Sequence, residues 1–133
     1  MNEVLNKFGP LAGRILMAVI FLLSGVGKIG NFAGTAAYMA HQGVPLTELA
    51  LVITIVIEVG GAALLILGWN VRFVAGVLFL WMIPVTLMFH NFWAAPADQH
   101  MIQQIMFLKN LAMMGGFLYV MTFGAGPYSL DRK

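Results

Sequence analysis

Five ionisable side chains stand within or at the ends of long apolar segments: Arg14, Lys28, Glu58, His90 and Lys109. A charged side chain at the centre of a bilayer costs about 2.5 to 3.5 kcal/mol on insertion scales, so each needs a partner, a cavity or a route to the surface. A carboxylate, an imidazole and an amine are also groups that transfer protons in catalysis. Glu58, His90 and Lys109 are therefore the candidate catalytic groups, with Glu58 as a proton relay.

Four apolar segments are long enough to hold these groups within a membrane. Of 133 residues, 61% are apolar and only 9% are charged, which lies outside the usual range of soluble domains. A span needs about 20 helical residues, and the sequence supplies four such segments, at 11–30, 47–67, 71–90 and 101–123. They are continuously apolar, unlike the alternating strands of a membrane barrel. We expect an all-α, integral membrane four-helix bundle that forms a single domain over residues 1–133.

The connections and the basic residues predict a surface helix and an orientation. The connection at 31–46 could form a short helix on the outer membrane surface, with Phe32, Tyr38 and Met39 inserted. Most basic residues lie on one side of the membrane: Lys7, Arg14, Arg72, Arg132 and Lys133. By the positive-inside rule both termini are expected to be cytoplasmic. Arg14 is expected to reach the inner headgroups.

Depth and side-chain direction bring the polar groups toward one another. Glu58 and Lys109 each lie about 12 to 15 Å from the outer surface. They lean outward, because a helical side chain points toward its own amino terminus, while Lys28 and His90 lean inward. Glu58 is thus expected opposite Lys109, and whether they form a structural ion pair or part of a ligand site stays open. The ligand-binding candidates on the same faces are Lys28, Ser24, Phe21, Thr54, Thr86, Gln103, Met106, Asn110 and Met113.

Small residues and helical phase predict how the segments pack. Glycines permit close approach of helices in lipid, and the helix-packing candidates are Gly60, Gly61, Gly115 and Gly116. In the third segment the phase places Phe79, Ile83, Thr86 and His90 on the inner face.

Composition also excludes several classes of function. The chain has no cysteine, which excludes disulfides, thiolate catalysis and thiol-ligated clusters. No metal site is expected. No basic run is present to neutralise phosphates, so nucleic acid is not an expected partner.

Five motifs, in this order, resemble the DoxX family of small four-span bacterial membrane proteins. They are GRILMAVIFLLSGVGK from Gly13, EVGGAALLILGWNVR from Glu58, HNFW from His90, QQIMFLKNLAMMGG from Gln103 and GPYSLD from Gly126. The resemblance implies a bacterial inner-membrane protein, with a link to quinone-dependent oxidation and redox complexes. A bound quinone is the one cofactor it suggests.

Three functions remain open from the sequence. The first is a quinone-associated oxidoreductase, or a subunit of a redox complex, in which quinone carbonyls meet Lys109, His90 or Lys28. The second is a non-catalytic scaffold or binding subunit that packs with membrane partners. The third is a small transporter, which would have to form a homo-oligomer because four spans are few for alternating access.

Overall fold

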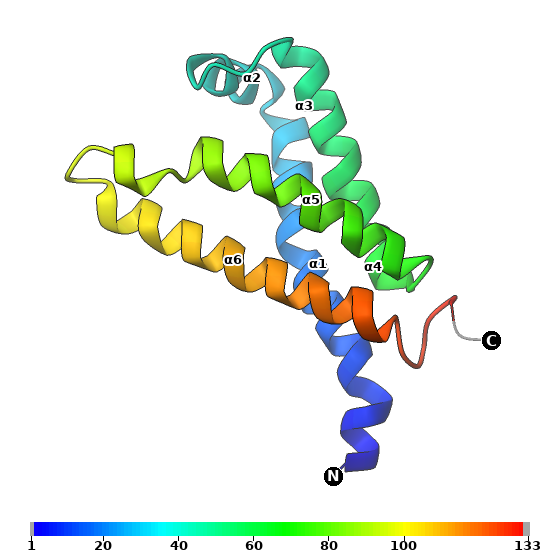
Figure 1. The fold of residues 1–133 in the computed structure, drawn as a ribbon. Coiled ribbons are helices and arrows are strands. Elements are labelled where there is room, and N and C mark those ends of the chain that lie inside the picture. Colours follow the sequence, from blue (N-terminus) through cyan, green and yellow to red (C-terminus); the bar gives the residue numbers. More distant parts are fainter. Residues whose placement is uncertain (1, 132–133) are drawn as a thin grey trace.

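The computed structural model describes residues 2–131, and this part of the chain consists of helices and short turns. Its elements are α1 (Asn2–Gly30), α2 (Phe32–His41), α3 (Thr47–Ile55), the π-helical segment η1 (Val56–Gly60), α4 (Gly61–Leu67), α5 (Val71–Phe89), the 3-10 turn η2 (Phe92–Ala94) and α6 (His100–Phe123), as shown in Figure 1. The all-α prediction is confirmed, and α2 confirms the helix expected in the first connection.

Four helical stretches are long and apolar enough to cross a membrane. They are Asn2–Gly30, Thr47–Leu67, Val71–Ala94 and His100–Phe123, so a helix of suitable length and apolarity covers each predicted span. The first helix begins at Asn2, well before the predicted span boundary at residue 11. Its first turns are helical but carry polar residues, which a prediction from apolar length does not include.

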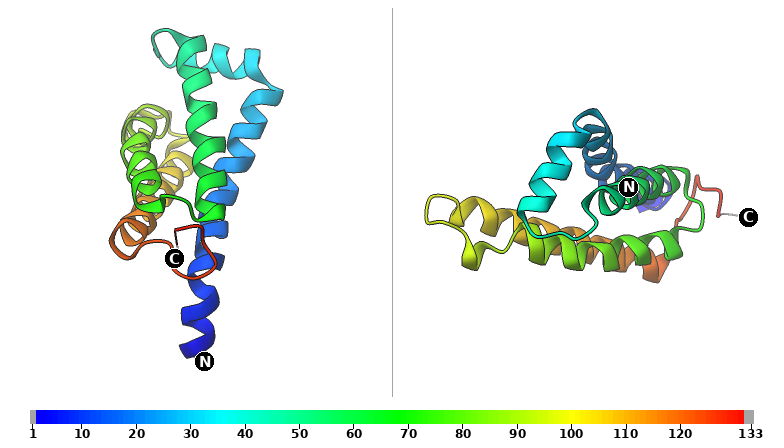
Figure 2. Two further views of the ribbon diagram at one scale, coloured as in Figure 1. Left: turned by 90° about the vertical axis from the view of Figure 1, so that its right-hand side faces the viewer. Right: turned by 90° about the horizontal axis from the view of Figure 1, so that it is seen from above.

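The spans form two antiparallel pairs. One pair is α1 with the continuous helix α3–η1–α4, and the other is α5 with α6. The pairs cross at a steep angle, meet where α4 turns into α5, and separate toward the end that carries α2 (Figures 1 and 2). The bundle is therefore closed at the end near the carboxyl terminus and open at the other.

The buried core lies where the two pairs meet. Phe21 of α1 and Phe117 of α6 contact each other there, with ring centroids 5.6 Å apart. Leu65 of α4 and Leu78 of α5 are fully buried beside them. Side chains in this core fix the crossing point of the pairs.

Two of the four predicted packing glycines lie at close approaches. A Cβ at Gly61 or Gly116 would lie 3.0 Å from a side chain of the other pair. At Gly60 and Gly115 nothing lies within 4 Å of that position, so the prediction is wrong for these two, which face away from the other helices. A further close approach was not predicted. At Gly25 a Cβ would lie 2.6 Å from a side chain of η1, so this glycine lets α1 and η1 touch.

The inner face of α5 agrees with the predicted one at Thr86 and differs from it at Ile83. Met82 and Thr86 are buried with Leu78, whereas Ile83 is 39% exposed. His90 was predicted to share this face. That residue lies beyond the end of α5 and has φ −129°, so its direction does not follow the helical phase.

Arg14 does not reach the headgroups; it is 2% exposed and holds the chain together at the closed end. Its guanidinium makes five hydrogen bonds to carbonyl oxygens, two on α4 and three on the carboxyl-terminal tail. The acceptors are Leu65, Ile66, Ala125, Pro127 and Tyr128, at 2.8 to 3.2 Å. Carbonyls at a helix end have no partner within the helix, and five guanidinium donors can serve several at once. The snorkelling expectation is therefore wrong.

The tail that Arg14 holds also caps the next helix. The Asp131 carboxylate accepts hydrogen bonds from the N–H groups of Asn70 (2.6 Å) and Val71 (2.9 Å) at the start of α5. Gly68 in the turn has φ +73°, and a Cβ there would lie 2.2 Å from Ser129 of the tail. The turn and the tail thus fit together only with glycine at this position.

Arg14→Lys tests the role of this guanidinium. Lysine keeps the charge but has three donors for five carbonyls, so the free energy of unfolding should fall by about 3 kcal/mol. Lys7→Gln removes a charge from an exposed part of the same helix and serves as the control, with a change within about 0.5 kcal/mol. Unfolding by heat or denaturant in detergent measures both. Equal stability of Arg14→Lys and the unmodified protein would contradict the assignment.

Candidate functional site

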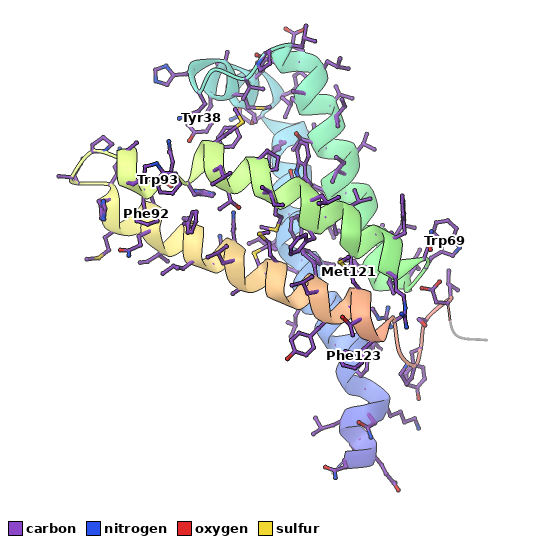
Figure 3. All side chains as sticks on the ribbon, in the orientation of Figure 1. Tyr38, Trp69, Phe92, Trp93, Met121 and Phe123 are labelled. Atoms are coloured by element: carbon purple, nitrogen blue, oxygen red, sulfur yellow. The ribbon has the colours of Figure 1, made fainter. Side chains whose placement is uncertain are left out.

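A cavity of about 540 Å³ lies between the two helix pairs, on the open side of the core. Its walls are mainly apolar, with contributions from α1, α2, α3, α5 and α6, and Tyr38 of α2 is one of its lining residues (labelled in Figure 3). Nine of the predicted site residues line it: Phe21, Ser24, Lys28, Thr54, Glu58, His90, Lys109, Asn110 and Met113. The predicted convergence of polar groups from all four spans therefore occurs.

The strongest polar contact in the cavity joins Lys28 and Glu58. Lys28 Nζ lies 2.7 Å from Glu58 Oε1, and the two side chains are 25% and 9% exposed. The ammonium also donates a hydrogen bond to Ser24 Oγ, one turn back on α1. Within residues 2–131, the Lys28 ammonium is the group that lies against Glu58 Oε1.

The backbone around Glu58 explains this pairing. Glu58 lies in the π-helical segment η1, which widens one turn of the second span. Such segments are often found at functional sites. Gly25 lets η1 approach α1 closely, and Lys28 follows Gly25 by one turn on α1. The amine that reaches Glu58 is therefore the one on the neighbouring helix.

Lys109 is not the partner of Glu58, which corrects the arrangement expected from depth. Its Nζ lies 3.3 Å from Met106 Sδ, a weak acceptor on its own helix. Helix α6 packs on α5, and the pair diverges from α1 and η1 toward this end. The amine still lines the same cavity, and no carboxylate among residues 2–131 forms an ion pair with it.

Three predicted site residues lie outside the cavity wall and contact residues that line it. Gln103 Oε1 lies 2.9 Å from His90 Nδ1, which fixes the imidazole across the α5–α6 pair. Thr86 Oγ1 accepts a hydrogen bond from Asn110 Nδ2 at 3.0 Å. Thr86, Gln103 and Met106 do not themselves line the cavity. Each instead holds a residue that does.

Sequence reasoning missed several aromatic lining residues. Tyr38 stacks on Phe89 of α5, with ring centroids 5.8 Å apart, and so bridges the two pairs. Trp81 of α5 also lines the cavity. A tryptophan near the middle of a span, far from the usual interfacial positions, was the signal available for Trp81.

The polar groups form two sets with different chemistry. Lys28 and Glu58 balance each other, whereas Lys109 adds a positive charge and His90 a group that can donate or accept a proton. In the part of the chain that the structure describes, no three His, Cys, Asp or Glu residues lie together as metal ligands do. The cavity thus offers donors to an electron-rich or anionic group at one place on an apolar wall.

Charge reversal tests the Lys28–Glu58 pair. Either Lys28→Glu or Glu58→Lys alone should lower the free energy of unfolding by about 3 kcal/mol, because each leaves two like charges together in a buried site. The two changes combined should recover most of the loss.

The control combines Glu58→Lys with Lys109→Glu and should not recover stability, because Lys109 does not contact Glu58. Thermal unfolding in detergent measures all four variants. Recovery in the control but not in the Lys28 combination would show that the pairing is wrong.

Comparison with known proteins adds relatives to this geometry. The DoxX family matches residues 9–91. The chain is 39% identical over 132 residues to inner membrane protein YqjF of Escherichia coli K12, covering 96% of this chain and 93% of that protein. It is 35% identical over 123 residues to inner membrane protein YphA of the same strain, covering 92% and 88%.

A more distant similarity extends to a larger protein. The chain is 26% identical over 130 residues to the Surfeit locus protein 4 homolog of Schizosaccharomyces pombe, covering 96% of this chain but 38% of that protein. No solved structure matches. The match over residues 9–91 and the two E. coli relatives, at 35 and 39% identity, show that the chain belongs to the DoxX family.

Proposed function

We propose that the cavity binds the carbonyl head group of an apolar-tailed ligand of the quinone class, and that the protein serves as a quinone-linked oxidoreductase or as a subunit of a redox complex. The observation that carries this proposal is the cavity itself, which places Lys28, Glu58, His90 and Lys109 on one otherwise apolar surface. Its volume of about 540 Å³ lies within the range of small-molecule sites.

The lining fits such a group in two respects. Lys109 offers a donor to a carbonyl oxygen, and neither Lys109 nor His90 is paired with a carboxylate within residues 2–131. The apolar walls, including Phe21 and Trp81, suit a ring and the start of its tail. A bound quinone would supply electron transfer, which no side chain of this cysteine-free protein offers in its place.

Each polar side chain then has a defined task. Lys109 Nζ orients the ligand by donating to an oxygen atom. Glu58 is the candidate proton relay, and Lys28, 2.7 Å from its Oε1, holds the carboxylate in place. Gln103 keeps the His90 ring in place through Nδ1, so that Nε2 is the ring atom left for a ligand.

Trp81 provides a reporter for ligand binding. Trp69 and Trp93 are 50% and 58% exposed and do not line the cavity, so Trp69→Phe with Trp93→Phe leaves the cavity tryptophan alone. A short-tailed ubiquinone analogue should quench its fluorescence saturably. Adding Lys109→Met should weaken binding about ten-fold, which corresponds to about 1.4 kcal/mol.

Lys7→Met at the other end of the molecule is the matched control and should leave binding unchanged. Quenching that does not saturate, or that Lys109→Met leaves intact, would contradict the quinone proposal. It would favour the second function, a scaffold subunit of a membrane complex in which the Lys28–Glu58 pair only joins helices.

We further propose that the chain resides in a bacterial inner membrane with both termini in the cytoplasm. Both E. coli relatives are named as inner membrane proteins, which supports the proposed location. The basic residues near the two termini, together with Arg72, support cytoplasmic termini by the positive-inside rule. The cavity would then open toward the outer leaflet.

The lack of cysteine makes the orientation simple to test. A cysteine placed by Gln42→Cys, after α2, should react with a membrane-impermeant maleimide added to intact spheroplasts. A cysteine placed by Asn2→Cys should react only after permeabilisation. The reverse pattern would overturn the orientation without affecting the proposed ligand.

A further inference from the structure

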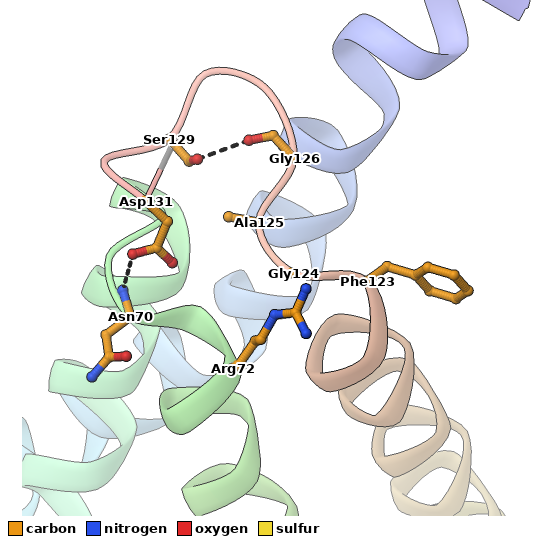
Figure 4. Close-up of a pocket in the computed structure, with 8 residues that line it drawn as sticks. All are labelled: Asn70, Arg72, Phe123, Gly124, Ala125, Gly126, Ser129 and Asp131. Carbon is orange, nitrogen blue, oxygen red and sulfur yellow. Dashed lines mark hydrogen bonds between the residues drawn. The ribbon is translucent and has the colours of Figure 1, made fainter. Parts of the chain in front are cut away.

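A second hollow, of about 420 Å³, lies at the closed end of the molecule, far along α5 and α6 from the cavity (Figure 4). It is formed by the start of α5 and by the tail that follows α6. The lining residues are Asn70, Arg72, Phe123, Gly124, Ala125, Gly126, Ser129 and Asp131. None of them belongs to the candidate site described above.

Among the lining residues that the structure describes, Arg72 is the one with a positive charge. The side chain is exposed, and its Nε and Nη2 lie beside Gly124, 3.2 Å from where a Cβ would be. Among residues 2–131 it forms no ion pair and donates no hydrogen bond to a carbonyl, unlike Arg14. The guanidinium therefore keeps its donors for a ligand.

The acid in the hollow does not neutralise Arg72. Both Asp131 carboxylate oxygens accept backbone N–H groups, at 2.6 Å from Asn70 and 2.9 Å from Val71. A carboxylate at a helix amino terminus is offset by the helix dipole. Figure 4 shows Asp131 directed toward Asn70, with Arg72 on the α6 side of the hollow.

Two exposed aromatic side chains lie near the carboxyl end of α6, next to the hollow. Phe123 lines the hollow and is 73% exposed, and Tyr119, one turn earlier on α6, is 71% exposed. Their rings stack with centroids 6.0 Å apart. A cation at the end of a span with an apolar strip beside it has the layout of a phospholipid, in which a phosphate is followed by acyl chains.

We propose that this hollow binds the headgroup of an anionic phospholipid, with the Arg72 guanidinium on the phosphate and the acyl chains along Phe123 and Tyr119. A planar guanidinium matches phosphate oxygens in a two-point contact. Basic pockets between spans at the cytoplasmic surface are known to take such headgroups. An anionic headgroup is preferred over a zwitterionic one, whose ammonium group would be repelled by Arg72.

Native mass spectrometry of the purified protein tests this site. The unmodified protein should retain one phosphatidylglycerol per chain, with about ten-fold preference over phosphatidylcholine. Arg72→Gln should bind both lipids equally. Lys7→Gln, which removes a cation from the same end of the molecule but outside the hollow, should keep the preference. An unchanged preference in Arg72→Gln would overturn the proposal.

Two further measurements separate the remaining outcomes. Inorganic phosphate at millimolar concentration should not displace the lipid; displacement would identify a free-anion site instead and overturn the lipid assignment. A photoactivatable phosphatidylglycerol should label peptides within residues 119–131 of the unmodified protein, a readout that does not require the variant to fold. Labelling confined to other segments would also overturn it.

Discussion

The buried guanidinium of Arg14 is the interaction on which the rest of this structure depends. It joins α1, the end of α4 and the tail after α6 through carbonyl oxygens, in an apolar environment where an unpaired polar group is costly. Because the tail is held there, Asp131 can cap α5 and the α4–α5 turn can pack against Ser129. One side chain thus fixes where the two helix pairs meet, and both the core and the hollow around Arg72 follow from that placement.

Fixing the pairs at one end leaves the other end free to separate. The contacts that bridge the pairs there are few and include the stacking of Tyr38 on Phe89. A space remains between them, and the polar residues that the spans carry at this depth line it. The two ends also differ in how their cations are bound. At the closed end the buried Arg14 guanidinium donates to carbonyl oxygens, whereas at the open end the Lys109 amine contacts only a thioether on its own helix.

Features that depend on local sequence could be predicted, whereas contacts between segments far apart in the sequence could not. Span positions follow from apolar length, and the polar lining follows from depth and helical phase, so both could be predicted. The partner of Glu58 could not, because it depends on which helices are neighbours and on the π-helical turn of η1. The role of Arg14 could not be predicted for a related reason, since its acceptors on α4 and the tail lie about 51 and 111 residues away in the sequence. His90 could not be placed by helical phase because it stands beyond the end of α5.

Because Glu58 pairs with Lys28 and not with Lys109, the unpaired positive charge of the cavity is on Lys109. Had Glu58 neutralised Lys109, the free amine would have been Lys28, at the end of α1, where headgroups and water are within its reach. The free amine is instead the exposed Lys109, within the α6 span, where a charge is costly unless water or a ligand solvates it. Water can fill that role, and so can a ligand oxygen, but an apolar lipid chain cannot. A site that requires an oxygen atom beside Lys109 and apolar groups beside Phe21 and Trp81 therefore selects for molecules that have both.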